Sequence, residues 1–253
     1  MIHYVIPVLN EAPNIGPLLE RLDSAAASVG ESYRVIAVDD GSTDDSIKEL
    51  KKYESKCKMD IFSFGVNRGI GEVIKTGFSK ACTTAPDDDP IVFIESDGSN
   101  DPSTLGKMIE KFRSGADIIS ASRYMDGGAS VNFPFKRSLV SKSANFLLRS
   151  GFPLPNTTDY TYFLKMYRSV TVRQAFEHYG EDIIKCKGFT ANAEFFIKMC
   201  LLTDQFEQVP TTYNYSRGDS LSKFNAKREI LDFIFLFRVC RAAMKDYVTI
   251  TSN

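Results

Sequence analysis

The chain has 253 residues, enough for one large domain with a substantial core, and its 43% hydrophobic and 25% charged residues are typical of an ordinary globular protein. The formal net charge of −1 leaves no basic excess, so nucleic acid is not expected as a partner. The five cysteines are scattered without a C-x-x-C spacing, which argues against a zinc site or a disulfide framework.

The first half of the chain alternates strand and helix patterns. Strands are predicted at Ile2–Ile6, Arg34–Val38, Ile61–Phe64, Ile91–Ile94 and Asp117–Ala121. The intervening helices are predicted at Ala12–Ala27, Asp44–Tyr53, Gly71–Ala81 and Pro102–Phe112. Strands separated by helices of about 10–15 residues indicate βαβ units and a mostly parallel sheet.

The second half is less regular. Helices are predicted at Phe135–Ser150, Gly188–Leu202 and Ala226–Lys245, and strands at Tyr162–Met166 and Glu207–Tyr213. We expect residues 1–253 to form a single domain. Within it, residues 1–125 would form a nucleotide and metal half, residues 126–225 an acceptor half, and residues 226–245 an apolar C-terminal helix.

The most informative segment runs from Glu95 to Pro102, directly after the buried strand pattern Ile91–Ile94. In open α/β folds, ligands bind at the carboxyl ends of such strands. Glu95 and Asp97 are two residues apart, so on an extended backbone they point the same way. Two carboxylates on one side suit Mg²⁺ or Mn²⁺ shared with substrate phosphates. The alternative interpretation is an acidic, hydrophilic turn.

Two further carboxylates follow predicted strands. Asp40 comes after the second strand and beside a glycine turn, where it can accept hydrogen bonds from a base or a ribose hydroxyl; the alternative is a simple turn with a helix cap. Glu11 opens the first helix, where its alternative role is to complement the helix dipole. The glycines in the segment 67–71 shape the start of the third helix, and their spacing is not that of a phosphate loop.

Basic and hydroxyl side chains recur after the fifth strand. They are Arg123, Arg137, Ser141, Arg217 and Lys223. Arg137 and Ser141 are four residues apart and therefore share one helix face. Cations that converge opposite an acidic metal site are what two negatively charged substrates would need, since arginine binds phosphate in a bidentate manner. The alternative is ordinary solvated surface charge.

Taken in order, these motifs resemble those of a known family. The segments VIPVLNEAPNI, AVDDGSTDDS, NRGIGEVIKTGF, IESDGSNDP and SRYMDGG resemble family 2 glycosyltransferases with the GT-A fold. The later segments FKRSLVSKSANFLLR, DYTYFLKMYRS, GFTANAEFFIKM and VPTTYNYSRGDSLSKF resemble the dolichyl-phosphate mannose synthase branch. The resemblance covers roughly residues 2–240 and implies an α/β fold of the GT-A type, with a Rossmann-like, mostly parallel sheet flanked by helices.

The resemblance also implies an activity. It is the inverting, metal-dependent transfer of a hexose, of the mannose or glucose type, from a GDP- or UDP-linked sugar to a polyprenyl or dolichyl phosphate. A phosphate acceptor is already anionic near neutral pH and needs no strong general base. A hydroxyl acceptor would need one, and Asp101 or Glu194 would be the candidates.

Site residues follow from matching positions. The nucleoside pocket would be lined by Pro7, Leu9, Glu11, Val38 and Asp40. The metal, Mg²⁺ or Mn²⁺, would be held by Glu95, Asp97 and Ser99, with Ser96 beside the donor. Arg123, Arg217 and Lys223 would bind donor phosphate, and Arg123, Arg137 and Ser141 the acceptor phosphate. Asp97, Arg217 and Lys223 would serve catalysis by neutralising the leaving diphosphate.

The chain departs from the family pattern at three places. Glu95 replaces an Asp, Leu9 stands where a Tyr is usual, and the segment 159–163 lacks the usual Pro and Gly. Two alternatives therefore stay open: a family 2 transferase acting on a polysaccharide or another hydroxyl acceptor, and an inactive nucleotide-sugar-binding protein. A Rossmann dehydrogenase is not expected, because no G-x-G-x-x-G follows the first strand.

The predicted C-terminal helix bears on location. Apolar residues cover much of its circumference and basic residues flank them, so it is either buried in the core or lies on a membrane or a small membrane subunit. No apolar run reaches the roughly 18–20 residues that span a bilayer, and the apolar start is too short for a secretory signal. We therefore expect a cytoplasmic protein or one that is peripheral on the cytoplasmic face of a membrane.

Overall fold

The computed structural model describes residues 1–154, 157–215 and 226–251, and in its last helix it describes the side chains of residues 231–245. Seven strands form one sheet: β1 (Ile2–Val8), β2 (Tyr33–Asp39), β3 (Lys58–Ser63), β4 (Pro90–Phe93), β5 (Ile118–Ser122), β7 (Lys165–Arg168) and β8 (Phe206–Pro210). Their order is β3-β2-β1-β4-β7-β5-β8. Only β7 among them runs antiparallel to its neighbours, so the predicted mostly parallel sheet is confirmed.

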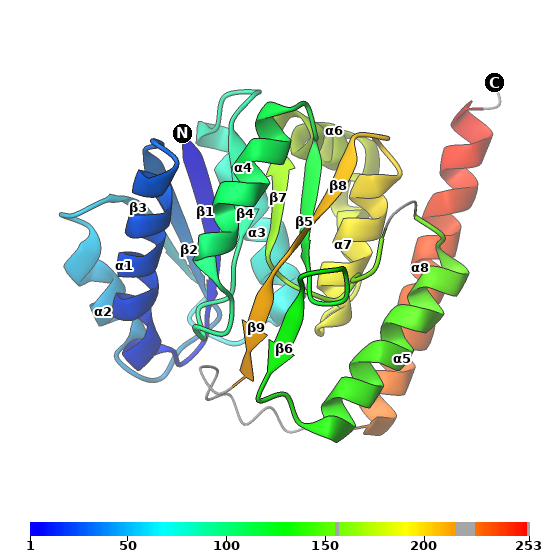
Figure 1. Cartoon of the computed structure of the whole chain (residues 1–253), viewed down its shortest axis with the longest axis horizontal. Coiled ribbons are helices and arrows are strands. Elements are labelled where there is room, and N and C mark those ends of the chain that lie inside the picture. The colour runs from blue at the N-terminus through cyan, green and yellow to red at the C-terminus, as the bar shows by residue number, and fades with distance from the viewer. Residues whose placement is uncertain (155–156, 216–225, 252–253) are drawn as a thin grey trace.

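Helices cover both faces of this sheet (Figure 1). One face packs against α1 (Ala12–Ser28), α2 (Ser46–Tyr53) and α4 (Leu105–Arg113), and the other against α3 (Ile70–Thr84), α6 (Ser169–Tyr179) and α7 (Thr190–Cys200). Short 3₁₀ turns occupy Pro102–Thr104 (η1) and Gly180–Ile183 (η2). The architecture is therefore a three-layer α/β arrangement with helices on both sides of the sheet.

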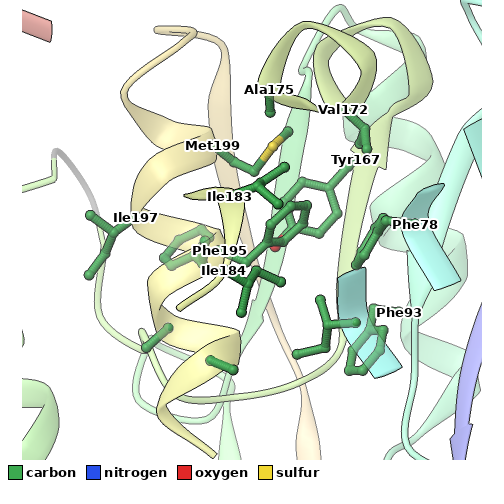
Figure 2. Close-up of a cluster of buried hydrophobic side chains, with 14 of the residues drawn as sticks. Phe78, Phe93, Tyr167, Val172, Ala175, Ile183, Ile184, Phe195, Ile197 and Met199 are labelled. Atoms are coloured by element: carbon green, nitrogen blue, oxygen red, sulfur yellow. The ribbon is translucent and has the colours of Figure 1, made fainter. Parts of the chain in front are cut away.

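Strand β1 shows how one apolar run contributes side chains to the hydrophobic clusters on both faces of the sheet. Tyr4 and Ile6 belong to the cluster on the α1 side, whereas Val5 belongs to the cluster on the α3 side. Because successive strand residues point to opposite faces, a strand covered on both sides reads as a continuous apolar run. On the α3 side, rings from α3, β7 and α7 meet, with 4.6 Å between the ring centroids of Phe78 and Phe195 (Figure 2).

Every predicted strand differs from the structure by at least one residue at one end, and in the second half of the chain the contacts explain two of these differences. The strand expected at Tyr162–Met166 is Lys165–Arg168, because the carbonyl oxygens of Thr161 and Tyr162 accept hydrogen bonds from the Asn192 side chain instead of a neighbouring strand. The strand expected at Glu207–Tyr213 divides after Pro210 into β8 and β9 (Thr212–Asn214). Strand β9 pairs with β6 (Ala129–Val131) in a separate two-stranded sheet.

One helix was not expected from the sequence. Helix α6 begins with Ser169 and contains Val170, Thr171 and Val172, whose β-branched side chains are a weak helix signal. Burial of Val172 and Ala175 against the core compensates for this weak local preference. Tertiary packing, rather than local sequence, therefore fixes this segment.

Two long helices lie side by side at one edge of the molecule (Figure 1). They are α5 (Phe135–Gly151) and α8 (Ala226–Thr251). The ring of Phe237 on α8 packs against that of Phe152, just past the end of α5, with 5.1 Å between centroids and a tilt of 44° between the ring planes. Among the helices of the described residues, none has both the length and the apolar character needed to cross a bilayer.

Candidate active site

The predicted acidic segment forms a folded loop at the carboxyl end of β4. The Asp97 carboxylate accepts hydrogen bonds from the Ser99 backbone N–H at 2.9 Å and the Ser99 hydroxyl at 2.6 Å. The Glu95 carboxylate accepts one from the Asn100 amide at 3.1 Å. The Ser96 hydroxyl donates to the Pro7 carbonyl at 2.6 Å, which ties this loop to the end of β1. The local bonds therefore hold both carboxylates at one sheet edge.

The electrostatics of this loop favour a cation. Burial, together with the nearby Asp97 carboxylate, raises the pKa of Glu95 to about 8. A divalent ion would relieve that repulsion, and Mg²⁺ commonly uses one or two protein carboxylates plus substrate phosphates. Glu95 and Asp97 therefore fit such an ion, although no group of three acidic, histidine or cysteine ligands occurs among the residues that the structure describes. Ser99 is itself buried, and its two hydrogen bonds to Asp97 support that carboxylate.

A first cavity opens at the ends of β1, β2 and β4. Its lining includes six of the residues predicted for the donor, which are Pro7, Leu9, Glu11, Asp40, Ser96 and Asp97. Asp40 accepts hydrogen bonds from the backbone N–H groups of Arg68 and Gly69, at 2.6 Å and 3.0 Å, so it also holds the loop before α3. Val38 is fully buried in the core and does not line the cavity.

A second cavity lies beside the first, between the sheet and α5. Arg123, Arg137 and Ser141, the residues predicted for the acceptor phosphate, all line it. Glu95 lines both cavities, and so do two aromatic residues, Phe163 and Phe189. The structure thus brings the acidic loop and the cationic residues to the two sides of one shared wall.

Arg123 is held firmly in the wall of the second cavity. It forms a two-bond ion pair with the buried carboxylate of Asp159, at 2.7 Å and 3.0 Å. Although burial opposes it, the Arg123 guanidinium lowers the pKa of Asp159. The same guanidinium lies 5.0–5.9 Å from the ring centroids of four aromatic residues, Tyr124, Phe133, Tyr162 and Tyr213.

The second cavity also presents an oriented hydroxyl. Ser141 Oγ accepts hydrogen bonds from Arg123 Nη2 at 3.3 Å and from the Tyr124 hydroxyl at 2.9 Å. Asn145, one turn further along α5, donates to the Ser141 carbonyl and to Thr161 Oγ1. Arg123 therefore positions Ser141 as well as contributing charge to the cavity.

Of the remaining predicted residues, two fall outside the part of the chain that the structure describes and two line neither cavity. Arg217 and Lys223 fall outside the described residues. Asp101 accepts a hydrogen bond from the Ser103 backbone N–H and lies on the α1 side, away from both cavities. Glu194 is buried and accepts hydrogen bonds from two backbone N–H groups and from Lys198 Nζ at 2.6 Å, so it anchors a loop rather than facing either cavity.

The sequence did not single out several residues that line the cavities. Lys187 lines the first cavity, Phe163 and Phe189 line both, and Tyr213 lines the second. Phe189 immediately precedes α7, where the sequence predicted only helix. No local pattern distinguishes these aromatic residues from core residues, so the tertiary structure was needed to find them.

Comparison with known proteins agrees with this arrangement. The family model described as Glycosyl transferase family 2 matches residues 4–176, more than half of the chain. The dolichol-phosphate mannosyltransferase of Pyrococcus furiosus is 32% identical over 149 residues, 59% of this chain and 40% of that protein. The undecaprenyl-phosphate 4-deoxy-4-formamido-L-arabinose transferase of Pectobacterium carotovorum is 30% identical over 166 residues, 65% of this chain and 47% of that protein. The chain thus spans less than half the length of either relative.

Solved structures share the fold at low sequence identity. S. aureus TarS in complex with UDP-GlcNAc superposes with a TM-score of 0.65 at 18% identity, covering 96% of this chain and 66% of that one. Glucosyl-3-phosphoglycerate synthase from Mycobacterium tuberculosis, in complex with Mn²⁺ and UDP, gives 0.59 at 17% identity, covering 98% and 79%.

The sheet and its acidic edge define an α/β protein of the GT-A type, as the resemblance implied. The chain belongs to glycosyl transferase family 2. The similarity to the polyprenyl-phosphate branch is confirmed, since the two relatives are named for dolichol phosphate and undecaprenyl phosphate.

Proposed function

We propose that this chain is an inverting hexosyltransferase that moves a mannose- or glucose-type sugar from a nucleotide diphosphate donor, GDP- or UDP-linked, to a polyprenyl or dolichyl phosphate. One observation carries the proposal. A cavity bordered by Glu95, Asp97 and Asp40 adjoins a cavity bordered by Arg123, Arg137 and Ser141. The first suits a metal-bound nucleotide and the second an anion, and the names of the two relatives agree with this pairing of substrates.

The residues divide the work as follows. Glu95 and Asp97 would hold Mg²⁺ or Mn²⁺, which when bound neutralises charge on the leaving diphosphate. Asp97 is oriented for this by its two bonds from Ser99. We also assign Arg217 and Lys223 to the donor phosphates on the ground of the family resemblance.

The acceptor side favours an anionic nucleophile. Arg137 and Ser141 would place a phosphate oxygen against the anomeric carbon, opposite the leaving group. Glu95 is the one carboxylate among the described residues that line the second cavity, and we assign it to the metal. No other carboxylate of this lining is then available as the general base that a hydroxyl acceptor would need. A phosphate acceptor needs no such base, so the lining supports the lipid phosphate over a polysaccharide hydroxyl.

A membrane-facing surface would bring the lipid to this cavity. We define the α5/α8 face by its exposed apolar residues Phe135, Leu139, Phe146, Leu147, Leu231, Ile234 and Phe235. Exposed basic residues border it, namely Lys136, Lys142, Arg149, Arg238 and Arg241. An apolar face with basic residues suits the cytoplasmic surface of a membrane with anionic lipids, or a small membrane subunit. On α8 the opposite side, with Leu236 and Cys240, is buried against the body of the protein.

The test uses the purified chain with radiolabelled GDP-mannose and UDP-glucose, Mg²⁺ or Mn²⁺, and polyprenyl phosphate. Label that enters the organic phase in a metal-dependent manner supports the proposal, and Asp97→Asn is expected to abolish it. Asp126→Asn serves as a matched control, because Asp126 is exposed and lines neither cavity. Metal-dependent release of diphosphate with label only in water-soluble products would favour a hydroxyl acceptor, and donor binding without turnover would favour an inactive binding protein.

A further inference from the structure

The wall between the two cavities has an aromatic component that none of the predicted roles uses. Phe163 and Phe189 both line the first cavity and the second. Phe163 is 7% exposed and packs on Phe93 of the core, with 5.8 Å between ring centroids. Phe189 meets Phe163 edge-on, at 6.1 Å and an interplanar angle of 88°, and remains 58% exposed. One ring is therefore fixed in the core, and the other presents free surface at the junction.

The backbone just before Phe189 is anchored by hydrogen bonds at three consecutive residues, 185 to 187. The buried Glu194 carboxylate accepts hydrogen bonds from the Lys185 and Cys186 backbone N–H groups, at 2.9 Å and 2.7 Å. The Lys187 carbonyl accepts one from the Gly71 N–H at the start of α3, at 3.4 Å. Glu194 is itself paired with Lys198. Phe189 is thus exposed on an anchored segment, just before the first residue of α7.

The exposed ring of Phe189 shares the first cavity with the carboxylates of Glu95 and Asp97, so a ligand bound there would have to offer both an apolar surface and polar groups. Water alone leaves the apolar surface of the ring unsatisfied, whereas a ligand that covers it recovers hydrophobic free energy. A hexose offers both surfaces, because its hydroxyls lie around the ring edge and its C–H groups form an apolar face. A donor sugar must also reach this junction if its anomeric carbon is to meet an acceptor in the second cavity.

We propose that Phe189 is a sugar-binding residue whose exposed ring packs against the C–H face of the donor hexose where the two cavities meet. Phe163 supports the ring, and Glu194 positions its loop. The inference rests on the proposed function for the identity of the ligand as a nucleotide sugar. It gives a role to a residue that lies in a matched segment but has no role assigned by the resemblance, and it assigns that residue to the sugar rather than to the nucleoside or the diphosphate.

The test compares nucleotide sugars with the same nucleotides lacking the sugar. Calorimetry with Mn²⁺ would give Kd values for UDP-glucose, UDP, GDP-mannose and GDP, measured for the wild-type protein, Phe189→Ala and Phe189→Trp. If the contact resembles a pair of aromatic rings, which contributes about 0.5–1.5 kcal/mol beyond its buried area, Phe189→Ala should weaken binding of the preferred nucleotide sugar roughly two- to twelvefold. Its affinity for the matching diphosphate should change less than about twofold, and Phe189→Trp should retain most of the sugar-dependent affinity.

Val66→Ala provides the control, because Val66 is 62% exposed and lines neither cavity. Thermal unfolding of each variant excludes a folding defect as the cause. Equal weakening of the diphosphate and the sugar nucleotide, or no weakening of either, would overturn the assignment. The comparison needs no lipid, so a wild-type protein that binds nucleotide sugars but labels no polyprenyl phosphate would refute the proposed acceptor and leave this test intact. A wild-type protein that binds none of the four nucleotides would refute both.

Discussion

The guanidinium of Arg123 and the carboxylate of Asp159 face each other inside the protein and share two hydrogen bonds, at 2.7 Å and 3.0 Å. Asp159 is fully buried, and it also accepts hydrogen bonds from the backbone N–H groups of Thr161 and Tyr162. The pair therefore joins the end of β5 to the segment before β7. Through Arg123 Nη2 the same pair reaches Ser141 on α5.

Removing the negative partner should be costly. Asp159→Asn would leave the Arg123 charge buried without its counter-ion, and breaking such a pair typically costs about 3–5 kcal/mol. We expect a decrease of about 3 kcal/mol in the free energy of unfolding, measured by urea denaturation. Asp88→Asn is the control, because Asp88 pairs with Arg168 while 90% exposed, and exposed pairs contribute only about 0–1 kcal/mol. A similar small effect for both variants would contradict this account of Asp159.

This ion pair also separates what could be predicted from the sequence from what could not. The alternation of apolar strands and helices predicts the parallel sheet, and parallel strands that end at one edge predict that Asp40 and Asp97 lie close together. In the structure Asp40 and Asp97 line the same cavity. Those inferences depend on local periodicity and on chain direction, which the amino-acid order records directly.

Long-range pairing is not recorded in that way. Arg123 was predicted to bind phosphate, yet nothing near it in the sequence shows that Asp159 engages two of its nitrogens. The sequence offers Glu194 as a candidate general base, whereas the folded protein pairs it with the Lys185 and Cys186 backbone N–H groups and with Lys198. From the sequence alone, Phe189 is indistinguishable from the other apolar residues of the helix predicted at Gly188–Leu202. Tertiary contacts decide which polar groups are available for ligands and which apolar groups are exposed.

A second prediction concerns Lys165, which is fully buried on β7 with its ammonium 4.9 Å from the Phe196 ring centroid. Burial lowers the pKa of Lys165 to about 7, even though Asp159 opposes that shift. Between this value and its ordinary value of about 10.4, the unfolded chain binds a proton that the folded protein lacks, so the contribution of Lys165 to stability rises with pH.

The wild-type protein should therefore gain stability relative to Lys165→Met as the pH rises from 7 to 9, by about 1–3 kcal/mol, since one pKa unit corresponds to about 1.4 kcal/mol. Urea denaturation at the two pH values measures the difference. Lys107→Met, at an exposed position on α4, should show no such change. A difference between wild type and Lys165→Met that is constant across this range would show that Lys165 does not titrate there.

A third prediction separates the acceptor from the donor. Ser141 Oγ receives two hydrogen bonds from neighbours, which leaves its own proton to donate into the second cavity. A hydrogen bond to a charged group contributes about 1.5–3 kcal/mol, so Ser141→Ala should raise the KM for polyprenyl phosphate by roughly tenfold or more. The KM for the nucleotide sugar should stay within about twofold. Ser143→Ala, exposed on the same helix, is the control; equal changes in both KM values would place Ser141 outside the acceptor site.

The last prediction tests the α5/α8 face as a membrane surface. Phe146 is 70% exposed on α5, on the same helix as the basic residues Lys142 and Arg149. If this face enters the headgroup region, Phe146→Asp loses apolar burial and adds a negative charge near anionic lipid. In sedimentation with vesicles of phosphatidylcholine and phosphatidylglycerol, we expect the bound fraction of wild type to exceed that of Phe146→Asp several-fold.

Raising the salt concentration should reduce wild-type binding to these vesicles, because screening weakens the attraction between basic residues and anionic headgroups. Val66→Asp introduces the same charge at an exposed apolar position outside the α5/α8 face and should bind vesicles like the wild type. Both variants should retain the wild-type affinity for the nucleotide sugar, since neither residue is among the described residues that line the first and second cavities. Equal vesicle binding by Phe146→Asp and Val66→Asp would rule out this face as the membrane contact, and a small membrane subunit would then be the partner to test on it.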